Sequence, residues 1–284
     1  MERELNFSGS SPLLYLISTP IGNLSEFSPR ALEIVGEADY VACEDTRNSS
    51  LLLSHYQIKK PTISCHEHNE EEAATKIIAL LKEGKKIVYM SDAGYPGISD
   101  PGERLVKRAI AEGIKVSVVS GPSAFIAALV ISGLPTNHFH FEGFLPAKES
   151  EKTARLNQLS KYEDTLIFYE APHRIVKTLV AMAATLGDRK ATLTRELTKA
   201  HEEVIRGSLV ELALLPEETL KGEMVIVVEG ATQKKEIDDQ TIAFALKDAL
   251  EYGRSSKEAI ASVSESLGVK KNRVYDIYLK SFGK

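Results

Sequence analysis

The sequence predicts an α/β fold with two domains, followed by a small helical module. Short apolar runs alternate with longer segments whose apolar residues have helical spacing, and this alternation is typical of α/β proteins. The alternation pauses at Gly133 and Pro135 and then restarts, which indicates a second α/β unit. The chain has 284 residues, more than one hydrophobic core usually serves, so its length also favours two domains.

The first unit contains four predicted strands, at residues 13–18, 39–43, 86–90 and 115–119. Helical segments separate them, and strands that are connected through helices form a mostly parallel sheet. In such sheets, ligands bind beyond the carboxyl ends of the strands. A binding site is therefore expected among the residues that directly follow these strands.

Three helices of the first unit are expected to begin at residues whose side chains can cap free amide groups: Ser28, Asn69 and Asp100. Pro29 follows Ser28, and proline suits the first helical position because no amide hydrogen is needed there. Glu72 and Glu103 lie three residues after the other two caps, which is the spacing of a capping box. The predicted ends of these helices are Gly36, Gly84 and Gly113.

The second unit contains five predicted strands, at residues 138–144, 165–170, 191–197, 202–205 and 223–230. Its helices are predicted at residues 149–162, 173–187 and 208–215. The last segment differs, because three helical stretches follow one another there with breaks at Gly253 and Gly268. This module is either helix-turn-helix-like or a helical cap on the second domain.

We expect the chain to divide into four parts: a flexible N-terminus (1–12), a first α/β domain (13–121), a second α/β domain (122–233) and a C-terminal helical module (234–284). The N-terminus lacks the apolar segment of a secretory signal, which predicts a cytoplasmic location. The longest apolar run, residues 124–131, is too short to cross a bilayer, so no membrane partner is expected. Cys43 and Cys65 offer no disulfide framework and fit a reducing compartment.

The net charge of −5 is unevenly distributed along the chain. From Arg254 onward, basic residues exceed acidic ones by four, so the rest of the chain carries −9. A basic module on an acidic body could contact phosphate groups, although a solvated helix face explains the charges equally well. The cations at the start of the last predicted helix are Lys270, Lys271 and Arg273.

Polar and charged side chains follow five predicted strands. They include Glu44, Asp45 and Arg47; Ser91 and Asp92; Ser120 and Ser123; Glu170, His173 and Arg174; and Glu196, Thr198 and Lys199. A single acid at such a position is more often a helix cap or an ion-pair partner. Their repetition at the carboxyl ends of strands nevertheless favours one shared cleft.

The loop "SDAGYPGISDPGE", Ser91 to Glu103, carries three glycines and two prolines directly behind a predicted buried strand. Its second part, from Ser99, is explained by the start of the helix that we expect Asp100 to cap. The first part, "DAGYPGI", has no such use. Glycine lets the backbone approach a ligand closely, so we expect this part to bind one, with the boundary near Ser99.

Other motifs give weaker signals. "CHEH", Cys65 to His68, has potential metal ligands, but no second cluster provides the spacing of a zinc site, so no metal is expected. "GPSAF" lacks the Gly-x-Ser-x-Gly elbow of a hydrolase, and no phosphate-binding loop of the Gly-x-x-x-x-Gly-Lys type is present. The absence of Gly-x-Gly-x-x-Gly after the first strand disfavours NAD enzymes.

Eight segments in order, "YLISTPIGNL", "ADYVACEDTR", "SCHEHNE", "SDAGYPGISDPG", "GPSAFIAAL", "EGFLPAK", "YEAPHRI" and "RELTKAHEE", resemble the ribosomal RNA small subunit methyltransferase I (RsmI) branch of the tetrapyrrole methylase superfamily. The resemblance implies two α/β domains with S-adenosylmethionine in the cleft between them. It also implies a homodimer that methylates the ribose 2′-hydroxyl of a cytidine in the decoding region of 16S ribosomal RNA, as free RNA or in the small ribosomal subunit. The superfamily's "GxGPGD" is "STPIGN" here and its "GDP" is replaced by "DAGYPG", which places the chain in this branch.

The resemblance also implies site residues. Those expected to bind the cofactor are Pro20, Asp92, Ala93, Gly94, Tyr95, Ile98, Ser123, Ala124, Tyr169, Glu170, Leu197 and Met224. The candidates for a catalytic carboxylate are Glu44, Asp45, Glu170 and Glu196. Of these, Glu170 or Glu196 is expected to orient the acceptor hydroxyl, unless they anchor loops instead. The cations available for RNA phosphates are Arg47, Lys148, Arg174 and Lys199, together with Lys270, Lys271 and Arg273.

Two other functions stay open from the sequence. The first is methylation of a small tetrapyrrole, as in precorrin or sirohaem synthesis, and this would need no RNA. The second is a nucleic-acid-binding regulator that acts through its C-terminal helices alone. The second would leave the polar strand ends without a role.

Overall fold

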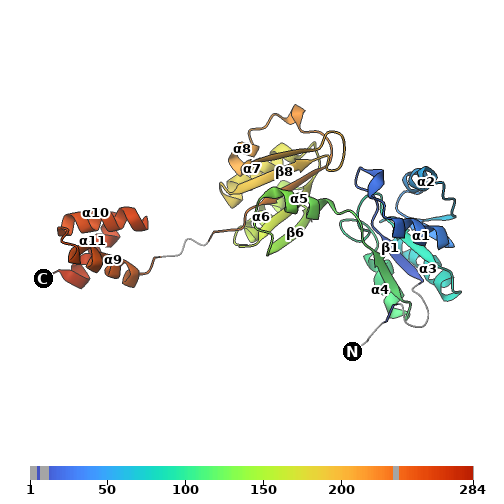
Figure 1. Cartoon of the computed structure of the whole chain (residues 1–284), viewed down its shortest axis with the longest axis horizontal. Helices are drawn as coiled ribbons and strands as arrows, with labels where there is room; N and C mark the ends of the chain where they lie inside the picture. The colour runs from blue at the N-terminus through green and yellow to red at the C-terminus, as the bar shows by residue number, and fades with distance from the viewer. Residues whose placement is uncertain (1–4, 7–12, 233–236, 284) are drawn as a thin grey trace. The chain divides into compact units, whose positions relative to one another are not determined.

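The computed structural model of the protein describes residues 5–6, 13–232 and 237–283. They fall into two compact units, Met1–Ala231 and Thr232–Lys284 (Figure 1). Most of the N-terminus that we expect to be flexible, residues 1–12, lies outside the described residues. The larger unit contains two five-stranded sheets and the smaller unit is helical, so the predicted fold class is confirmed.

The first sheet is entirely parallel. Its strands are β1 (Leu14–Ile17), β2 (Tyr40–Cys43), β3 (Thr62–Ser64), β4 (Ile87–Met90) and β5 (Val116–Val119), in the spatial order β3-β2-β4-β1-β5. The four longer strands lie within the predicted runs, and the sequence analysis missed β3. Because all five strands run the same way, the loops after them meet at one edge of the sheet.

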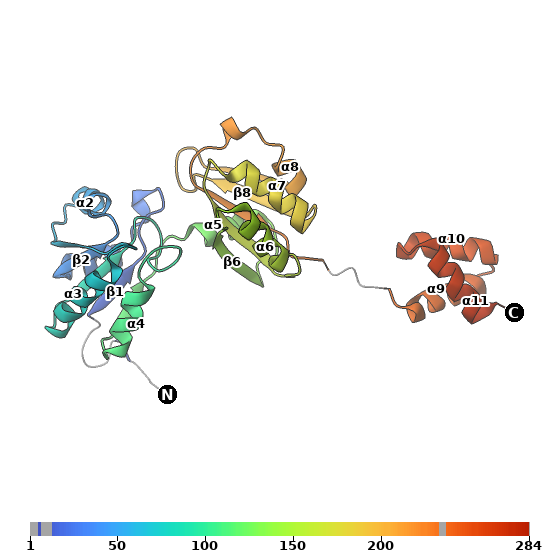
Figure 2. The ribbon, with the colours of Figure 1, turned by 180° about the vertical axis from the view of Figure 1, so that it is seen from behind.

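Helices cover both faces of the first sheet (Figure 2). They are α1 (Pro29–Glu37), α2 (Thr46–His55), α3 (Glu70–Lys82) and α4 (Glu103–Ala111), with a short 3-10 turn, η1, at Leu24–Glu26. Alternate side chains of β4 show the arrangement: Ile87 and Tyr89 pack with α3 and α4, whereas Val88 and Met90 pack with α1 and α2. A strand buried on both faces has a continuous apolar run, which explains the sequence "IVYM".

The second sheet is mixed. Its strands are β6 (Phe139–Phe144), β7 (Thr165–Glu170), β8 (Lys190–Arg195), β9 (Glu203–Ser208) and β10 (Met224–Val228), in the order β6-β7-β10-β8-β9. Only β6 and β7 are parallel, and β10 runs antiparallel to both of its neighbours. Met224, the first residue of β10, therefore pairs with Glu170 and Arg195, the last residues of β7 and β8. The beginning of one strand and the ends of two others share one edge.

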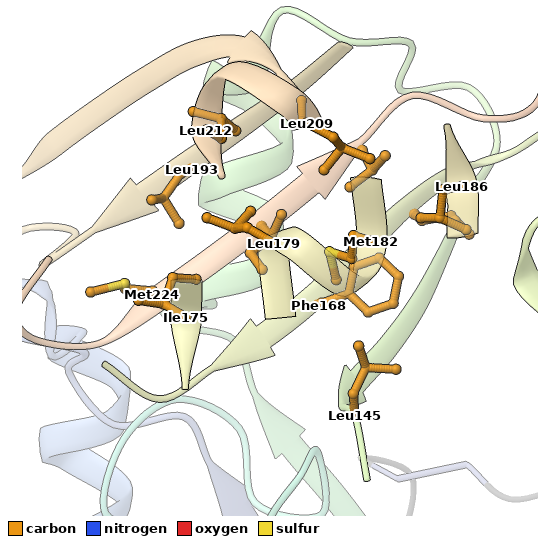
Figure 3. Packing of buried hydrophobic residues seen from close by; sticks show 14 of the residues in the cluster. Leu145, Phe168, Ile175, Leu179, Met182, Leu186, Leu193, Leu209, Leu212 and Met224 are labelled. Carbon is orange, nitrogen blue, oxygen red and sulfur yellow. The ribbon is translucent and has the colours of Figure 1, made fainter. Parts of the chain in front are cut away.

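The second sheet also has two covered faces. On one face lie α6 (Glu149–Leu159), α7 (Ile175–Leu186) and α8 (Leu209–Leu212), with η2 (Glu217–Thr219) on the chain that follows. Figure 3 shows this core, in which Leu179 and Met182 of α7 pack with Phe168 of β7. On the other face lies α5 (Ala124–Ser132), together with Ile21 from the loop after β1. Ile21 thus joins the first sheet's loops to the core of the second sheet.

The predicted helix caps had mixed outcomes. The hydroxyl of Ser28 accepts a hydrogen bond from the Ala31 amide at 3.1 Å, so this cap is confirmed. Asn69 is the N-cap residue of α3, so the predicted start of this helix is confirmed. Its side chain makes no capping bond, however, and its amide oxygen accepts from the His66 amide at 2.8 Å. The predicted cap at Asp100 is wrong, because α4 begins at Glu103 and its N-cap is Gly102. The loop after β4 therefore extends through Gly102.

The helical unit contains α9 (Asp239–Glu251), α10 (Ser256–Leu267) and α11 (Lys271–Phe282), which confirms the three predicted helices. A separate core holds them together, including Leu246 of α9, Ile260 of α10 and Val274 of α11. The Ser255 hydroxyl caps α10 in a complete capping box with Glu258. In the described part of the chain, no helix is both long and apolar enough to cross a membrane.

Gly102 provides a test of how strongly the loop after β4 is constrained. It has φ of +138°, and an added Cβ would lie 2.7 Å from Cε1 of the buried Tyr89. We expect Gly102→Ala to lower the free energy of unfolding by about 1–3 kcal/mol, as measured by urea denaturation.

The matched control is Gly36→Ala, because Gly36 lies in α1 with nothing within 4 Å of an added Cβ. This variant should leave stability unchanged or raise it by about 0.5–1 kcal/mol, because alanine favours the helix. Equal stability of the two variants would contradict the conformation described for the loop.

Candidate active site

A cavity of about 320 Å³ lies between the two sheets of the larger unit. Small-molecule sites usually have volumes of roughly 300–1,000 Å³. Its walls come from the loops after β1, β4, β5 and β8, the end of β6, the end of β7 with its loop, and the start of β10 with the residue before it. They comprise Ile21, Ala93, Gly94, Tyr95, Ile98, Ser99, Asp100, Ser123, Ala124, Phe144, Tyr169, Glu170, Ala171, Pro172, Leu197, Glu223, Met224 and Val225.

The loop after β4 is held by its own backbone and by neighbouring loops. Thr19 and Gly94 form an isolated antiparallel bridge, with N–O distances of 2.9 and 3.1 Å. The hydroxyl of Ser91 donates to the Gly94 carbonyl at 2.9 Å. The hydroxyl of Tyr95 accepts from the Gly121 amide at 3.1 Å, which ties the loop to the segment after β5. These bonds fix the backbone that lines the first half of the cavity.

Aromatic side chains line the opposite wall. The rings of Phe144 and Tyr169 lie 5.5 Å apart, centroid to centroid, and Phe141 packs edge-on against Tyr169. Burial raises the pKa of the Tyr169 phenol to about 12. Tyr169 therefore stays protonated near neutral pH and offers the cavity an apolar ring with a neutral hydroxyl.

Asp100 is the acid whose environment is most unusual in the cavity. Burial is the main cause that raises its pKa to about 6, and the nearby carboxylates of Glu44 and Asp92 raise it further. A hydrogen bond with the Ser91 side chain acts in the opposite direction. Near neutral pH Asp100 is thus a half-buried carboxylate that binds a proton more readily than an ordinary aspartate.

The structure brings most of the residues expected to bind the cofactor into this cavity. Ala93, Gly94, Tyr95, Ile98, Ser123, Ala124, Tyr169, Glu170, Leu197 and Met224 all line it. Pro20 and Asp92 do not, and line an adjacent cavity of about 290 Å³ with Asn48, Leu51 and His55. Each of these two residues is followed in the chain by one that does line the main cavity: Ile21 follows Pro20, and Ala93 follows Asp92.

Some lining residues were missed in the sequence. They include Ile21, Ser99, Asp100, Phe144 and Glu223. Asp100 was missed because it fits the pattern of a helix cap. Glu223 directly precedes β10, and nothing in the sequence shows that this strand is antiparallel and begins at the edge where its neighbours end.

The candidate catalytic carboxylates lie in different surroundings, and only Glu170 lines the cavity. Its carboxylate is 1% exposed and accepts from the Thr178 hydroxyl at 2.6 Å and the Ala171 amide at 2.8 Å. Arg174 also contacts it, with Nε 3.0 Å from Oε1. These bonds hold the carboxylate against the start of α7, as expected of a side chain that anchors a loop.

The other three candidates lie outside the set of lining residues. Glu196 binds the ammonium group of Lys199 at 3.0 Å and the Glu223 amide at 3.1 Å, and the Lys199 hydrogen bond lowers its pKa. Asp45 caps α2 and pairs with Arg47, which lowers the Asp45 pKa to about 2. Burial raises the pKa of Glu44.

The cations expected to bind RNA differ in their exposure and in how many groups of the protein they already bind. Arg174 donates to the Leu145 carbonyl at 2.7 Å besides its bonds to Glu170, and Lys199 pairs with both Glu196 and Glu223. Arg47 and Lys148 have largely exposed side chains, at 88% and 72%.

In the helical unit, Lys270 and Lys271 are exposed. Arg273 instead pairs with Asp239 at 2.8 Å and donates to the Ile237 carbonyl, which ties α11 to α9. Among the residues that the structure describes, no group of three or more Asp, Glu, His or Cys side chains is placed to hold a metal ion.

The fold defines an α/β protein that has two sheets with a cavity between them, and comparisons with known proteins identify its family. The family described as Tetrapyrrole (Corrin/Porphyrin) Methylases matches residues 13–213. The ribosomal RNA small subunit methyltransferase I of Bacillus subtilis (strain 168) is 42% identical over 288 residues, which cover 98% of each chain. The protein of that name from Mesorhizobium japonicum is 46% identical over 253 residues, covering 87% of this chain and 86% of the relative.

The chain therefore belongs to the tetrapyrrole methylase family, in the branch of the ribosomal RNA small subunit methyltransferases I. The resemblance seen in its eight sequence segments is confirmed. The solved structure of the methyltransferase CobJ is similar with a TM-score of 0.60 at 18% identity, covering 78% of this chain and 95% of that one. Uroporphyrin-III-C-methyltransferase from Thermus thermophilus has a TM-score of 0.53 at 19% identity, covering 76% and 93%. Such identities show a shared fold.

The contacts of Glu170 predict a structural effect of its substitution. We expect Glu170→Gln to lower the free energy of unfolding by about 2–4 kcal/mol, because it removes a buried charge that Arg174 and Thr178 require. Urea denaturation measures the change. Glu103→Gln is the control, since Glu103 pairs with Lys107 where both side chains are more than 70% exposed, and it should change stability by no more than about 0.5 kcal/mol. Unchanged stability of Glu170→Gln would contradict an anchoring role.

Proposed function

We propose that this protein transfers the methyl group of S-adenosylmethionine to small-subunit ribosomal RNA, at the ribose 2′-hydroxyl of a cytidine in the decoding region of 16S RNA. The observation that carries the proposal is the cavity between the sheets, in a chain similar over nearly its whole length to ribosomal RNA small subunit methyltransferases I. The target position within the RNA comes from the sequence resemblance.

The residues of the cavity fit S-adenosylmethionine in size and chemistry. Apolar side chains from both sheets, such as Ile21, Leu197 and Met224, can enclose an adenine ring and an aliphatic chain. The close-packed loop of Ala93 and Gly94 leaves backbone groups at the wall, and the carboxylate of Asp100 favours a positively charged ligand. When bound, the cofactor supplies a methyl group on a positively charged sulfur.

The residues of the protein contribute to such a reaction mainly by positioning the two reactants. Walls from both sheets hold a ligand and exclude water, and orientation of two reactants can supply a large part of the rate. Glu170 is held rigidly by α7, so we propose that it shapes the wall after β7. The Glu196 carboxylate accepts from the Glu223 amide, and we propose that this bond fixes the backbone of Glu223 beside the cavity.

The proposal includes RNA-binding residues and an assembly. Lys270 and Lys271 have exposed side chains that can meet phosphate groups. Arg47 and Lys148 are also largely exposed, although each pairs with an acid on the surface, Asp45 and Glu151. Arg174, Lys199 and Arg273 have less exposed side chains that bind within the protein, and would contribute less. We further propose a homodimer that works in the cytoplasm, where the small ribosomal subunit is found. Sedimentation of the purified protein tests the dimer.

The decisive experiment uses radiolabelled S-adenosylmethionine and small ribosomal subunits from cells that lack this protein. The proposal predicts incorporation of label into 16S RNA, and mapping of the modified nucleotide to a cytidine ribose in the decoding region. Free 16S RNA in a parallel reaction tells whether the assembled subunit is required. No incorporation into either substrate, with transfer to a tetrapyrrole instead, would overturn the proposal.

Filling the cavity should weaken cofactor binding. Ala93 is exposed to the cavity, and Ala93→Leu adds bulk there. We expect the dissociation constant for S-adenosylmethionine to rise about fivefold or more by isothermal titration calorimetry, because overpacking costs about 1–3 kcal/mol and 1.4 kcal/mol equals a factor of ten. Ala79→Leu on the exposed face of α3 is the control and should leave it unchanged. Equal affinities of both variants would exclude this cavity as the cofactor site.

A further inference from the structure

Asp100 stands apart from the other acids of the cavity in its contacts. Three lining residues carry carboxylates: Asp100, Glu170 and Glu223. Glu170 pairs with Arg174 at 3.0 Å, and Glu223 pairs with Lys199 at 2.9 Å. Asp100 forms no ion pair with any Lys, Arg or His that the structure describes, and the charged groups that affect it most are the acids Glu44 and Asp92.

The hydrogen bonding of Asp100 is also incomplete. The carboxylate of Asp100 has the Ser91 hydroxyl as its hydrogen-bond partner. The same hydroxyl also donates to the Gly94 carbonyl, at 2.9 Å. A serine hydroxyl has a single proton, so Ser91 cannot donate fully to both acceptors. The carboxylate of Asp100 therefore keeps free acceptor capacity on the side of the cavity that it lines.

The acids that face Asp100 favour uptake of a proton by it, whereas the hydrogen bond with the Ser91 hydroxyl acts in the opposite direction. Glu44 at the end of β2 and Asp92 in its own loop are acids, and both raise its pKa together with burial. Tyr169 of β7 faces it with a phenol whose pKa of about 12 keeps it neutral. A carboxylate with a pKa near 6 is a stronger base than an ordinary aspartate and is still ionised at neutral pH.

We propose that Asp100 is the catalytic residue that accepts the proton of the acceptor hydroxyl during methyl transfer. The inference rests on the proposed function and deepens it. In the balanced step, the hydroxyl oxygen forms a bond to the methyl carbon while the carbon–sulfur bond breaks, its electron pair stays on sulfur, and the hydroxyl proton moves to Asp100. Asp100 then returns the proton to water.

The test is Asp100→Asn in the full-length protein, assayed under single turnover with small subunits that lack the modification. We expect the rate to fall by about 10²–10⁴-fold, the usual contribution of a general base, while the dissociation constant for S-adenosylmethionine changes less than about threefold. The wild-type rate should fall below about pH 6, and this dependence should be absent from the residual rate of the variant. Asp100→Glu should retain part of the rate, and Glu72→Gln on α3 should match wild type.

A second readout needs no substrate. The raised pKa means that folded protein binds the proton of Asp100 more tightly than the unfolded chain does, so this group favours folding at low pH and that benefit is lost as pH rises from about 4 to about 6. Wild-type stability relative to Asp100→Asn should therefore decrease over this range. If the stability difference between wild type and Asp100→Asn did not change between about pH 4 and about pH 6, the pKa of Asp100 would be that of an ordinary aspartate, and the inference would be overturned.

The kinetic test has outcomes that would count against Asp100. A variant rate within about tenfold of wild type would exclude it as the base, and a parallel loss of cofactor affinity would make it a cofactor-binding residue. Wild-type protein that transfers no label to RNA would overturn the proposed function and this inference together. Active wild type with an active Asp100→Asn would overturn the inference alone.

Discussion

The conformation of the loop between β4 and α4 is the constraint on which the cavity depends. Gly94, Gly97, Ser99 and Gly102 all have positive φ, and Ser99 adopts this region without being glycine, at a cost of about 1–3 kcal/mol. The bridge from Thr19 to Gly94 offsets part of this cost, as does the Glu70 carboxylate, which accepts from the Gly102 amide at 3.2 Å. A loop fixed at both ends in this way presents Ala93, Ile98 and Asp100 to the cavity together.

The distribution of charge around this loop divides the acids into two kinds. Glu170 and Glu196 have their charge satisfied by neighbours within the protein, and such acids stabilise the loops that they bind. Glu44 and Asp100 lie where burial raises their pKa values. A buried charge without an ion-pair partner lowers the stability of a protein, and proteins keep such charges mainly at functional sites.

Several features were predictable from the sequence because they are local. Four strands of the first sheet lie in largely apolar runs, and Ser28 with Pro29 marks the start of α1 through bonds within one turn. The same reasoning failed at Asp100, which is not the cap of α4, and at Asn69 it gave the right start of α3 but not the side-chain bond. A side chain that can cap a helix can also find a partner elsewhere. It also missed β3, which has only three residues, and α2, which follows the charged cluster at the end of β2.

The sequence by itself determined the alternation of strands and helices, the two successive α/β segments, the helical C-terminal unit and, through its eight segments, the family. Only the tertiary structure decided which polar residues share a cavity. The antiparallel direction of β10 brings Glu223 and Met224 to the ends of β7 and β8, and the extended loop brings Asp100 inside. Strand direction and loop path depend on contacts between residues far apart in the chain, and local patterns do not encode such contacts.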